Sequence, residues 1–271
     1  MPSSERTLFS DFPSPVSLAS DSDAELFTLA LSLIPGMGPR RGARAIEQFG
    51  SARAVFESSR RELEDAGMSG ALAQSVLSGG SFDEAILQRE KAADFGTKII
   101  PIGTPLYPLR LSEIADPPLV LYAKGDAAFL SAISVGVVGT RRPTAYGKAV
   151  AERLSKDISD LGIAVVSGMA RGVDTYAHKA ALKGSGGTIA VFGCGVDVIY
   201  PAENRALASE IAEAGLVLSE FPMGSPSYPQ NFPVRNRIVS GLSRGILVVE
   251  GAQYSGSAIT ARIAIEQGRI V

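Results

Sequence analysis

The pattern of apolar and polar positions changes once along this chain of 271 residues. Up to about Gly96, apolar residues recur at the spacing of helices that bury one face. From Ile133 onward, short apolar runs alternate with helical segments, which is typical of strands joined by crossover helices. We therefore expect a small all-α domain over residues 24–96 and a doubly wound, mostly parallel α/β domain over residues 97–271.

Proline and glycine mark two helices at the start of the first domain. A buried helix over Ala24–Ile34 ends at Pro35, and a second helix covers Pro39–Phe49. The link, Ile34–Gly38, has the shape of a helix-hairpin-helix turn, whose glycine amides can be presented to a phosphate. The alternative is a turn that only lets two helices pack closely. Three arginines stand just beyond it: Arg40, Arg41 and Arg44.

Serine and glycine positions predict the rest of this domain. Ser81 and Glu84 form a capping-box pattern at the start of a helix that Gly96 ends. Shorter helices are expected near residues 52–57, 60–66 and 71–77. Residues 1–23 contain seven serines and three prolines but few apolar positions, so a disordered tail is expected there.

The second domain contains a series of short apolar strands. Two of them flank a Pro-rich segment that is interpreted as a lead-in, whereas the others alternate with helices. In such a sheet, ligands bind outside the carboxyl ends of the strands. The expected strands are Lys98–Ile102, Leu119–Tyr122, Ile133–Val138, Ile163–Ser167, Thr188–Phe192, Leu216–Ser219, Gly245–Glu250 and one that starts at Arg269.

The strand ends carry residues that suit a phosphate-bearing ligand. The stretch Val135–Gly147 predicts a strand, a tight loop and a helix start, where close backbone approach and exposed amides favour an anion. Its glycines do not make the dinucleotide fingerprint G-x-G-x-x-G, and a plain strand-to-helix turn is the alternative. The candidate ligand-binding residues of this edge are Gly139, Thr140, Arg141, Ser167, Gly168, Arg171, Gly172, Arg235, Asn236, Arg237, Ser255, Gly256, Ser257 and Thr260.

Arginines and aromatic residues of the edge loops refine this hypothesis. Arg235 and Arg237 lie two positions apart at a helix start and point to different faces, so we expect one to bind the ligand and the other to pair with a carboxylate. Arg142 is expected to be solvated or ion-paired. Aromatic rings beside arginines suit stacking on unpaired bases, although most of them are expected to cap the sheet. The stacking candidates are Tyr146, Tyr228 and Phe232.

Composition limits the function further. The net charge is −2, so a nucleic-acid site has to be local. Cys194 is the single cysteine, which excludes an internal disulfide, fits a reducing cytoplasm and suggests a packing residue. His178 is the single histidine, so a metal site that included it would lack a second histidine or a cysteine partner, and a metal site is not expected. Asp174 is expected to stabilise a helix start, with acid/base work by Asp174 and His178 as the less favoured alternative.

Neither a signal peptide nor a run of about 18 apolar residues is evident. We therefore expect a cytoplasmic chain that does not span a membrane. No cofactor and no metal ion are predicted.

Five long stretches of the chain closely resemble the DNA-processing protein A family, also called Smf. They read VGTRRPTAYG, SGMARGVDTYAH, TIAVFGCGVDVIYPAEN, SEFPMGSPSYPQNFPVRNRIVSGLS and VVEGAQYSGSAITARIAIEQGR. The likeness extends back through the Pro-rich lead-in and the helical part, and so covers roughly residues 24–271.

This resemblance implies a helical domain like the sterile alpha motif, followed by an extended Rossmann-like domain that binds single-stranded DNA. It also implies a homodimer that loads RecA recombinase onto incoming strands during natural transformation and catalyses no reaction. The family's glycine-serine-arginine loop, whose arginine contacts DNA phosphate, corresponds to Gly139, Thr140 and Arg141; the threonine keeps the hydroxyl. Its arginine-asparagine-arginine stretch corresponds to Arg235, Asn236 and Arg237. Many members carry a winged-helix domain, which would lie beyond Val271.

Two other function classes remain open. Rossmann-like sheets of this kind also occur in nucleotide-processing phosphoribohydrolases of the lysine-decarboxylase-like type. Their P-G-G-x-G-T-x-x-E loop is missing, because the corresponding edge reads GAQYSGSAITARIAIEQG. A scaffold that acts only through protein contacts does not explain the glycine loops and arginines at the ligand edge.

Overall fold

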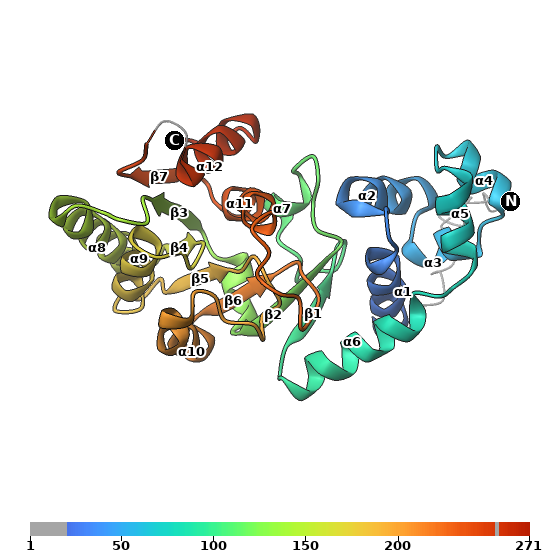
Figure 1. Ribbon diagram of the computed structural model, residues 1–271, viewed down its shortest axis with the longest axis horizontal. Coiled ribbons are helices and arrows are strands. Elements are labelled where there is room, and N and C mark those ends of the chain that lie inside the picture. Colours follow the sequence, from blue (N-terminus) through green and yellow to red (C-terminus); the bar gives the residue numbers. More distant parts are fainter. Residues whose placement is uncertain (1–20, 253–254) are drawn as a thin grey trace, which may run out of the picture.

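The computed structural model describes residues 21–252 and 255–271, and its first part is helical, as predicted (Figure 1). The first helix begins at Asp21, so the last three residues of the expected tail are helical, and the rest of that tail lies outside the described residues. The helices are α1 (Asp21–Leu33), α2 (Gly38–Phe49), α3 (Ala52–Glu57), α4 (Arg60–Asp65), α5 (Gly70–Leu77) and α6 (Phe82–Asp94).

A capping box lies in this part, but not at the predicted place. Ser81 precedes α6 with helical backbone angles (φ −83°, ψ −10°) and makes no side-chain cap. The box forms instead at α4, where the Glu62 amide donates to the Ser59 hydroxyl at 3.4 Å and the Ser59 amide donates to the Glu62 carboxylate at 2.7 Å. The prediction at Ser81 is wrong because a capping serine needs a non-helical backbone, which Ser59 has (φ −72°, ψ 158°).

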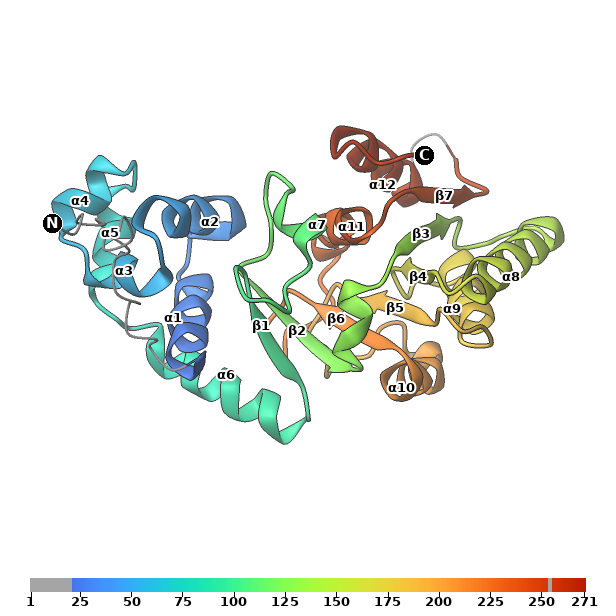
Figure 2. The same ribbon diagram turned by 180° about the vertical axis from the view of Figure 1, so that it is seen from behind.

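The second part is built on a seven-stranded sheet of order β1-β2-β6-β5-β4-β3-β7 (Figure 2). The five strands from β3 to β7 pair in parallel, as predicted. β1 and β2, which flank the Pro-rich lead-in, extend the same sheet as antiparallel strands. The strand expected from Arg269 is reduced to a bridge between Gly245 and Ile270. The strands are β1 (Lys98–Pro101), β2 (Val120–Gly125), β3 (Ser134–Gly139), β4 (Ala164–Ser167), β5 (Thr188–Val191), β6 (Leu216–Ser219) and β7 (Ile246–Val249).

Helices cover both faces of this sheet, as the apolar strands require (Figure 1). Neighbouring strand residues point to opposite faces: Val137 packs with Ala177 under α8 and α9, and Val138 packs with Val239 under α11 and α12. The helices are α7 (Leu109–Ser112), α8 (Ala145–Asp160), α9 (Val173–Ala181), α10 (Arg205–Ala214), α11 (Asn231–Leu242) and α12 (Gly256–Glu266), with short 3₁₀ helices at Ala127–Ser131 and Ala202–Asn204.

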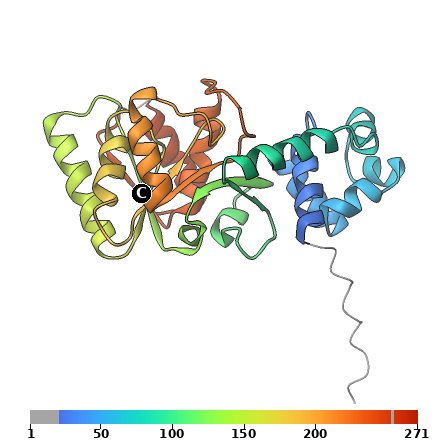
Figure 3. The same ribbon diagram turned by 90° about the horizontal axis from the view of Figure 1, so that it is seen from below.

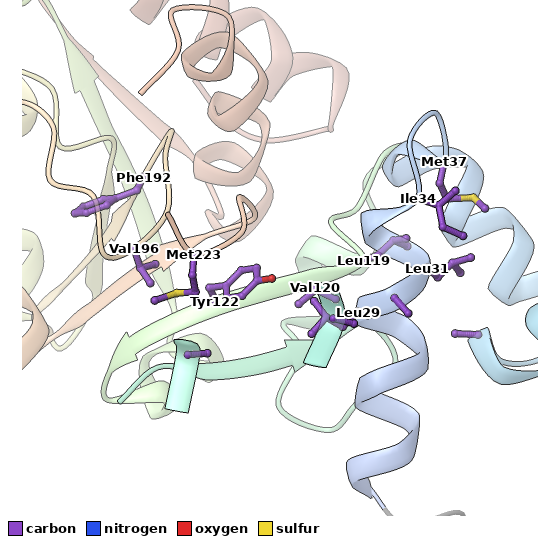
Figure 4. Close-up of a cluster of buried hydrophobic side chains, with 14 of the residues drawn as sticks. Leu29, Leu31, Ile34, Met37, Leu119, Val120, Tyr122, Phe192, Val196 and Met223 are labelled. Carbon is purple, nitrogen blue, oxygen red and sulfur yellow. The ribbon is translucent and has the colours of Figure 1, made fainter. Parts of the chain in front are cut away.

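One apolar core crosses the junction between the two parts of this elongated molecule (Figures 3 and 4). Leu29 and Met37 of the helical part belong to the same buried cluster as Tyr122 of β2. The Gln88 side chain of α6 accepts a hydrogen bond from the Met223 amide at 2.7 Å and donates to the Met223 carbonyl at 3.3 Å. The helical part is therefore held firmly against the sheet.

Within the described residues, none of the helices combines the length and the apolar character needed to cross a bilayer.

Candidate functional site

A polar cleft opens at the carboxyl edge of the parallel strands, where a ligand site was predicted. Its volume is about 570 Å³, in the range of pockets that hold small ligands. We call it the edge cleft. It is lined by Val138, Gly139, Thr140, Arg141, Gly168, Ala170, Asp174, Tyr200, Ser227, Pro229, Phe232, Pro233, Arg235, Asn236, Val239, Ser255, Gly256, Ser257, Ile259 and Thr260.

The structure brings most of the candidate residues together in this cleft, although they come from four separate stretches of sequence. Those that line it are Gly139, Thr140, Arg141, Gly168, Phe232, Arg235, Asn236, Ser255, Gly256, Ser257 and Thr260. Those that do not line it are Tyr146, Ser167, Arg171, Gly172, Tyr228 and Arg237.

The loop after β3 presents Arg141 to the cleft on a tightly packed base. A side chain at Gly139 would overlap the carbonyl oxygen of Val249, so this glycine is required by the packing of β3 against β7. The Thr140 amide donates to the Glu250 carbonyl at 2.8 Å, which holds the loop against the end of β7. Arg141 is exposed on this loop and lines the cleft, so its guanidinium can reach a ligand.

The start of α8 is filled by a carboxylate of the protein itself. Glu250 accepts hydrogen bonds from the Thr144 hydroxyl and, at 2.8 Å, from the Thr144 amide, and these bonds lower the pKa of Glu250. A side chain at Gly147 would overlap this carboxylate. The expectation that this helix start binds the anion of a ligand is therefore wrong.

Arg235 lies beneath the cleft and joins the ends of two strands. Its guanidinium donates to the carbonyl of Gly168 at 2.6 Å and to the carbonyl of Val191. The residue is 4% exposed, and this burial lowers the pKa of Arg235 to about 10. The guanidinium carbon of Arg235 lies over the ring of Phe232, 6.0 Å from the ring centroid. Arg235 thus braces the cleft floor and adds a buried positive charge beneath it.

Asp174 lies beside this charge at the start of α9, as predicted for a residue that stabilises a helix start. Its carboxylate accepts hydrogen bonds from the amides of Gly168 at 3.1 Å and Ala170 at 3.2 Å. Burial raises the pKa of Asp174 to about 6, although the charge of Arg235 opposes this rise. Asp174 therefore fixes the loop after β4.

Arg237 points away from the cleft and pairs with two carboxylates, Glu220 and Asp116. It donates to both oxygens of Glu220, one of them at 2.6 Å, and its Nε lies 3.1 Å from the Asp116 carboxylate. Burial alone would lower the pKa of Arg237, but the hydrogen bond and charge of Glu220 raise it. The expectation that one of the two arginines pairs with a carboxylate is confirmed, and Arg237 is that arginine. Arg237 is withdrawn as a ligand contact because its guanidinium is buried and already bound.

Three other candidates support the edge loops without lining the cleft. The hydroxyl of Ser167 is buried and donates to a β3 carbonyl at 2.6 Å. Gly172 has a φ of 77°, and a Cβ there would lie 2.5 Å from the Thr140 carbonyl oxygen. Arg171 forms an exposed ion pair with Glu203, whose hydrogen bond and charge raise the pKa of Arg171.

An aromatic pair forms one wall of the cleft. The rings of Tyr200 and Phe232 lie 5.2 Å apart at an angle of 40°, and Tyr200 is 42% exposed. Tyr200 was not among the predicted stacking residues, although its position in the loop after β5 is a signal that could have found it. Tyr146 and Tyr228 are exposed outside the lining.

The lone histidine and cysteine are enclosed away from the cleft. His178 is fully buried with Nδ1 2.7 Å from the Thr188 hydroxyl, and burial lowers the pKa of His178 to about 3. The thiol of Cys194 donates to the Val198 carbonyl at 2.9 Å, and burial raises the pKa of Cys194 to about 11. Cys194 is therefore a packing residue, as predicted. Across the described ranges, no three His, Cys, Asp or Glu side chains are grouped to hold a metal ion.

The fold and the cleft define a Rossmann-like α/β protein whose polar, arginine-bearing site lies at the carboxyl edge of its sheet. The model of the DNA recombination-mediator protein A family matches residues 98–271. The chain belongs to this family, which confirms the resemblance seen in its motifs.

Curated relatives agree with this assignment. The chain is 49% identical over 177 residues to the DNA processing protein DprA of Bacillus subtilis, covering 65% of this chain and 60% of that protein. It is 43% identical over 174 residues to protein Smf of Escherichia coli, covering 64% of this chain and 46% of that protein. The matched part of the chain thus spans less than two thirds of these relatives.

Two solved structures share the fold. The X-ray structure of DprA from Streptococcus pneumoniae superimposes with a TM-score of 0.77 at 35% identity, over 91% of this chain and 84% of that one. A structure of DprA from Helicobacter pylori, described by its single-stranded DNA binding mode, gives a TM-score of 0.59 at 34% identity, over 64% of this chain and 78% of that one. The first likeness includes the helical part as well as the sheet.

Proposed function

We propose that this chain binds single-stranded DNA in the edge cleft and catalyses no reaction on it. The observation that carries the proposal is the composition of the cleft. Arg141 is exposed on one side, the start of α12 with its small residues forms another, and the ring of Tyr200 is open to a base. Cationic and aromatic groups arranged along one cleft suit a strand whose bases are unpaired.

The family assignment supports this proposal, because a recombination mediator acts on DNA. The description of the Helicobacter pylori relative as a binder of single-stranded DNA supports it as well. The lack of catalysis is supported by the state of the reactive groups: Asp174 is bound to backbone amides, and His178 and Cys194 are buried outside the cleft.

The wider role extends this proposal. The chain would protect incoming single strands and load RecA recombinase onto them during natural transformation, as a homodimer in the cytoplasm. RecA loading is tested by the rate of RecA filament formation on single-stranded DNA with and without the chain. Sedimentation equilibrium tests the dimer.

Fluorescence anisotropy with labelled oligothymidylate and with a duplex of equal length tests DNA binding. We expect preference for the single strand, and weakening by about tenfold or more in Arg141→Gln, because a hydrogen bond to a charged group contributes about 1.5–3 kcal/mol. The proposal fails if the wild type does not bind the single strand, and the site assignment fails if Arg141→Gln binds as tightly as the wild type.

A nucleotide-processing phosphoribohydrolase is the second candidate, because the cleft is large enough for one nucleotide and holds the buried Asp174 beside Arg235. Incubation with nucleoside monophosphates and chromatography for free base separates the two functions. We expect no release of base, and release by the wild type but not by Asp174→Asn would favour the enzyme.

A further inference from the structure

A second basic surface lies on α2, outside the edge cleft. The arginines on the other helices of residues 21–96 pair with carboxylates; they are Arg53, Arg60, Arg61 and Arg89. The arginines of α2 are exposed and, among the described residues, none of them pairs with a carboxylate; they are Arg40, Arg41 and Arg44. In this lack of ion pairs, α2 differs from the other arginine-bearing helices of its domain.

This positive charge is local and unfavourable for the isolated helix. Residues 21–96 contain eight Lys and Arg and twelve Asp and Glu, a net charge of −4, whereas α2 carries its three arginines against the single acidic residue Glu47. Arg40 and Arg44 stand one turn apart on the same face, and like charges at this spacing destabilise a helix. A polyanion bound along this face would remove that repulsion.

The turn before α2 keeps one arginine in place beside a hollow with both polar and apolar lining. Arg41 donates to the carbonyl of Gly36 at 2.8 Å. The hollow next to it has a volume of about 300 Å³, and its lining includes Arg41 and the residues Ser69 and Ser75. Backbone and hydroxyl groups around an arginine suit phosphate oxygens.

The start of α2 lies beside the connection that leads from β6 to the edge cleft. Gly38, at the start of α2, lines a small pocket together with Phe221, which follows the carboxyl end of β6. Ser227 and Pro229, which come later in the same connection, line the edge cleft. A side chain at Gly42 would overlap Leu119, so the face of α2 opposite Arg40 and Arg44 is packed on the chain just before β2, and the arginine face is left open. In the sheet order β2 lies three strand spacings from β4, which is about 14 Å.

We propose that α2 is a second contact for the phosphate backbone, and that it holds the part of the single strand that leaves the edge cleft along the connection after β6. This inference rests on the proposed function, because the strand has to occupy the cleft first. The partner is a single-stranded polyanion, to which the exposed arginines are complementary in charge.

The test compares two lengths of oligothymidylate, about 6 and about 16 nucleotides, which lie near the short and the long end of the site sizes of single-strand-binding folds. The variant Arg40→Gln/Arg44→Gln removes two charges and keeps Arg41 on the turn. The matched control is Arg60→Gln/Arg61→Gln, which removes two exposed but ion-paired arginines from the same domain. A thermal unfolding midpoint close to that of the wild type shows that each variant is folded.

We expect the wild type to bind the longer strand more tightly and with a steeper dependence on salt. In the α2 variant, the slope of log K against log salt should fall in magnitude by about 1.4 for the longer strand, at about 0.7 per phosphate contact, and stay unchanged for the shorter one. The control variant should behave as the wild type with both.

Equal slopes for the wild type and the α2 variant on the longer strand would overturn the inference. The arginines would then be assigned to contact with an acidic protein surface. Loss of binding to both lengths in a folded α2 variant would also overturn it, because α2 would then act on the cleft itself. Failure of the wild type to bind either length would refute the proposed function, and this inference with it.

Discussion

Replacing Glu220 by alanine is expected to destabilise the fold without removing the proposed DNA site. The side chains of Arg237 and Glu220 are only 6% and 10% exposed, so the variant leaves a buried guanidinium without its main partner. Removing one member of a buried pair costs about 3–5 kcal/mol. In the variant, Asp116 still lies 3.1 Å from the Nε of Arg237, although its side chain is 47% exposed. Because this partner remains, we expect a loss at the lower end of that range, about 3 kcal/mol. For a chain of this size that is roughly 6–12 °C in Tm.

Thermal and urea unfolding followed by circular dichroism measure this change, and anisotropy with oligothymidylate at a temperature where the variant is folded measures binding. We expect an affinity close to that of the wild type, because Arg237 does not line the edge cleft. Asp157→Ala is the control, because it breaks an exposed pair with Arg153 and should change stability by less than about 1 kcal/mol. A wild-type Tm, or a large loss of DNA affinity in a stable Glu220→Ala, would refute the structural role of the pair.

Three further predictions concern the cleft. Gly139→Ala should lose about 1–3 kcal/mol of unfolding free energy, because the new Cβ overlaps the Val249 carbonyl. Gly256 has open space around it, so Gly256→Ala should keep the stability and lower only the DNA affinity. Urea unfolding measures the stability of both variants, and anisotropy measures their DNA affinity. Tyr200→Ala should weaken single-strand binding by about 1–3 kcal/mol if one base stacks there, and anisotropy at fixed salt measures the loss. The pKa of Asp174 is about 6 in the folded chain, against an ordinary 3.8. Protonation of this carboxyl therefore contributes stability that is fully present below pH 3.8 and is lost as the pH rises through 6. Compared with Asp174→Asn, the wild type should therefore lose roughly 3 kcal/mol between pH 3 and 7 in urea unfolding.

Much of the architecture could be predicted because local patterns specify it. Apolar runs that alternate with helical segments indicate a parallel sheet, and the rule that ligands bind at its carboxyl edge led to residues that the fold does bring together. Contacts between distant segments carry no such local signal. The carboxylate of Glu250 fills the start of α8 although it is 106 residues from Thr144, and β1 and β2 join the sheet through antiparallel pairing.

The two arginines of α11 show the same limit. Their spacing predicts opposite directions, but it does not indicate which side holds carboxylates. Arg237 meets Glu220 across 17 residues and Asp116 across 121, whereas Arg235 faces strand carbonyls under the cleft. The capping serine was likewise ambiguous, since Ser59 and Ser81 both precede a glutamate by three residues and only the backbone conformation separates them.

The salt dependence of single-strand binding shows whether Arg141 contacts a DNA phosphate in the edge cleft. Arg141 lines the edge cleft, and its neighbour Arg142, also exposed, does not, so the two arginines form a matched pair. We predict that Arg141→Gln lowers the magnitude of the slope of log K against log salt by about 0.7, the value of one phosphate contact, and that Arg142→Gln keeps the wild-type slope. Identical slopes for the wild type and both variants would contradict it.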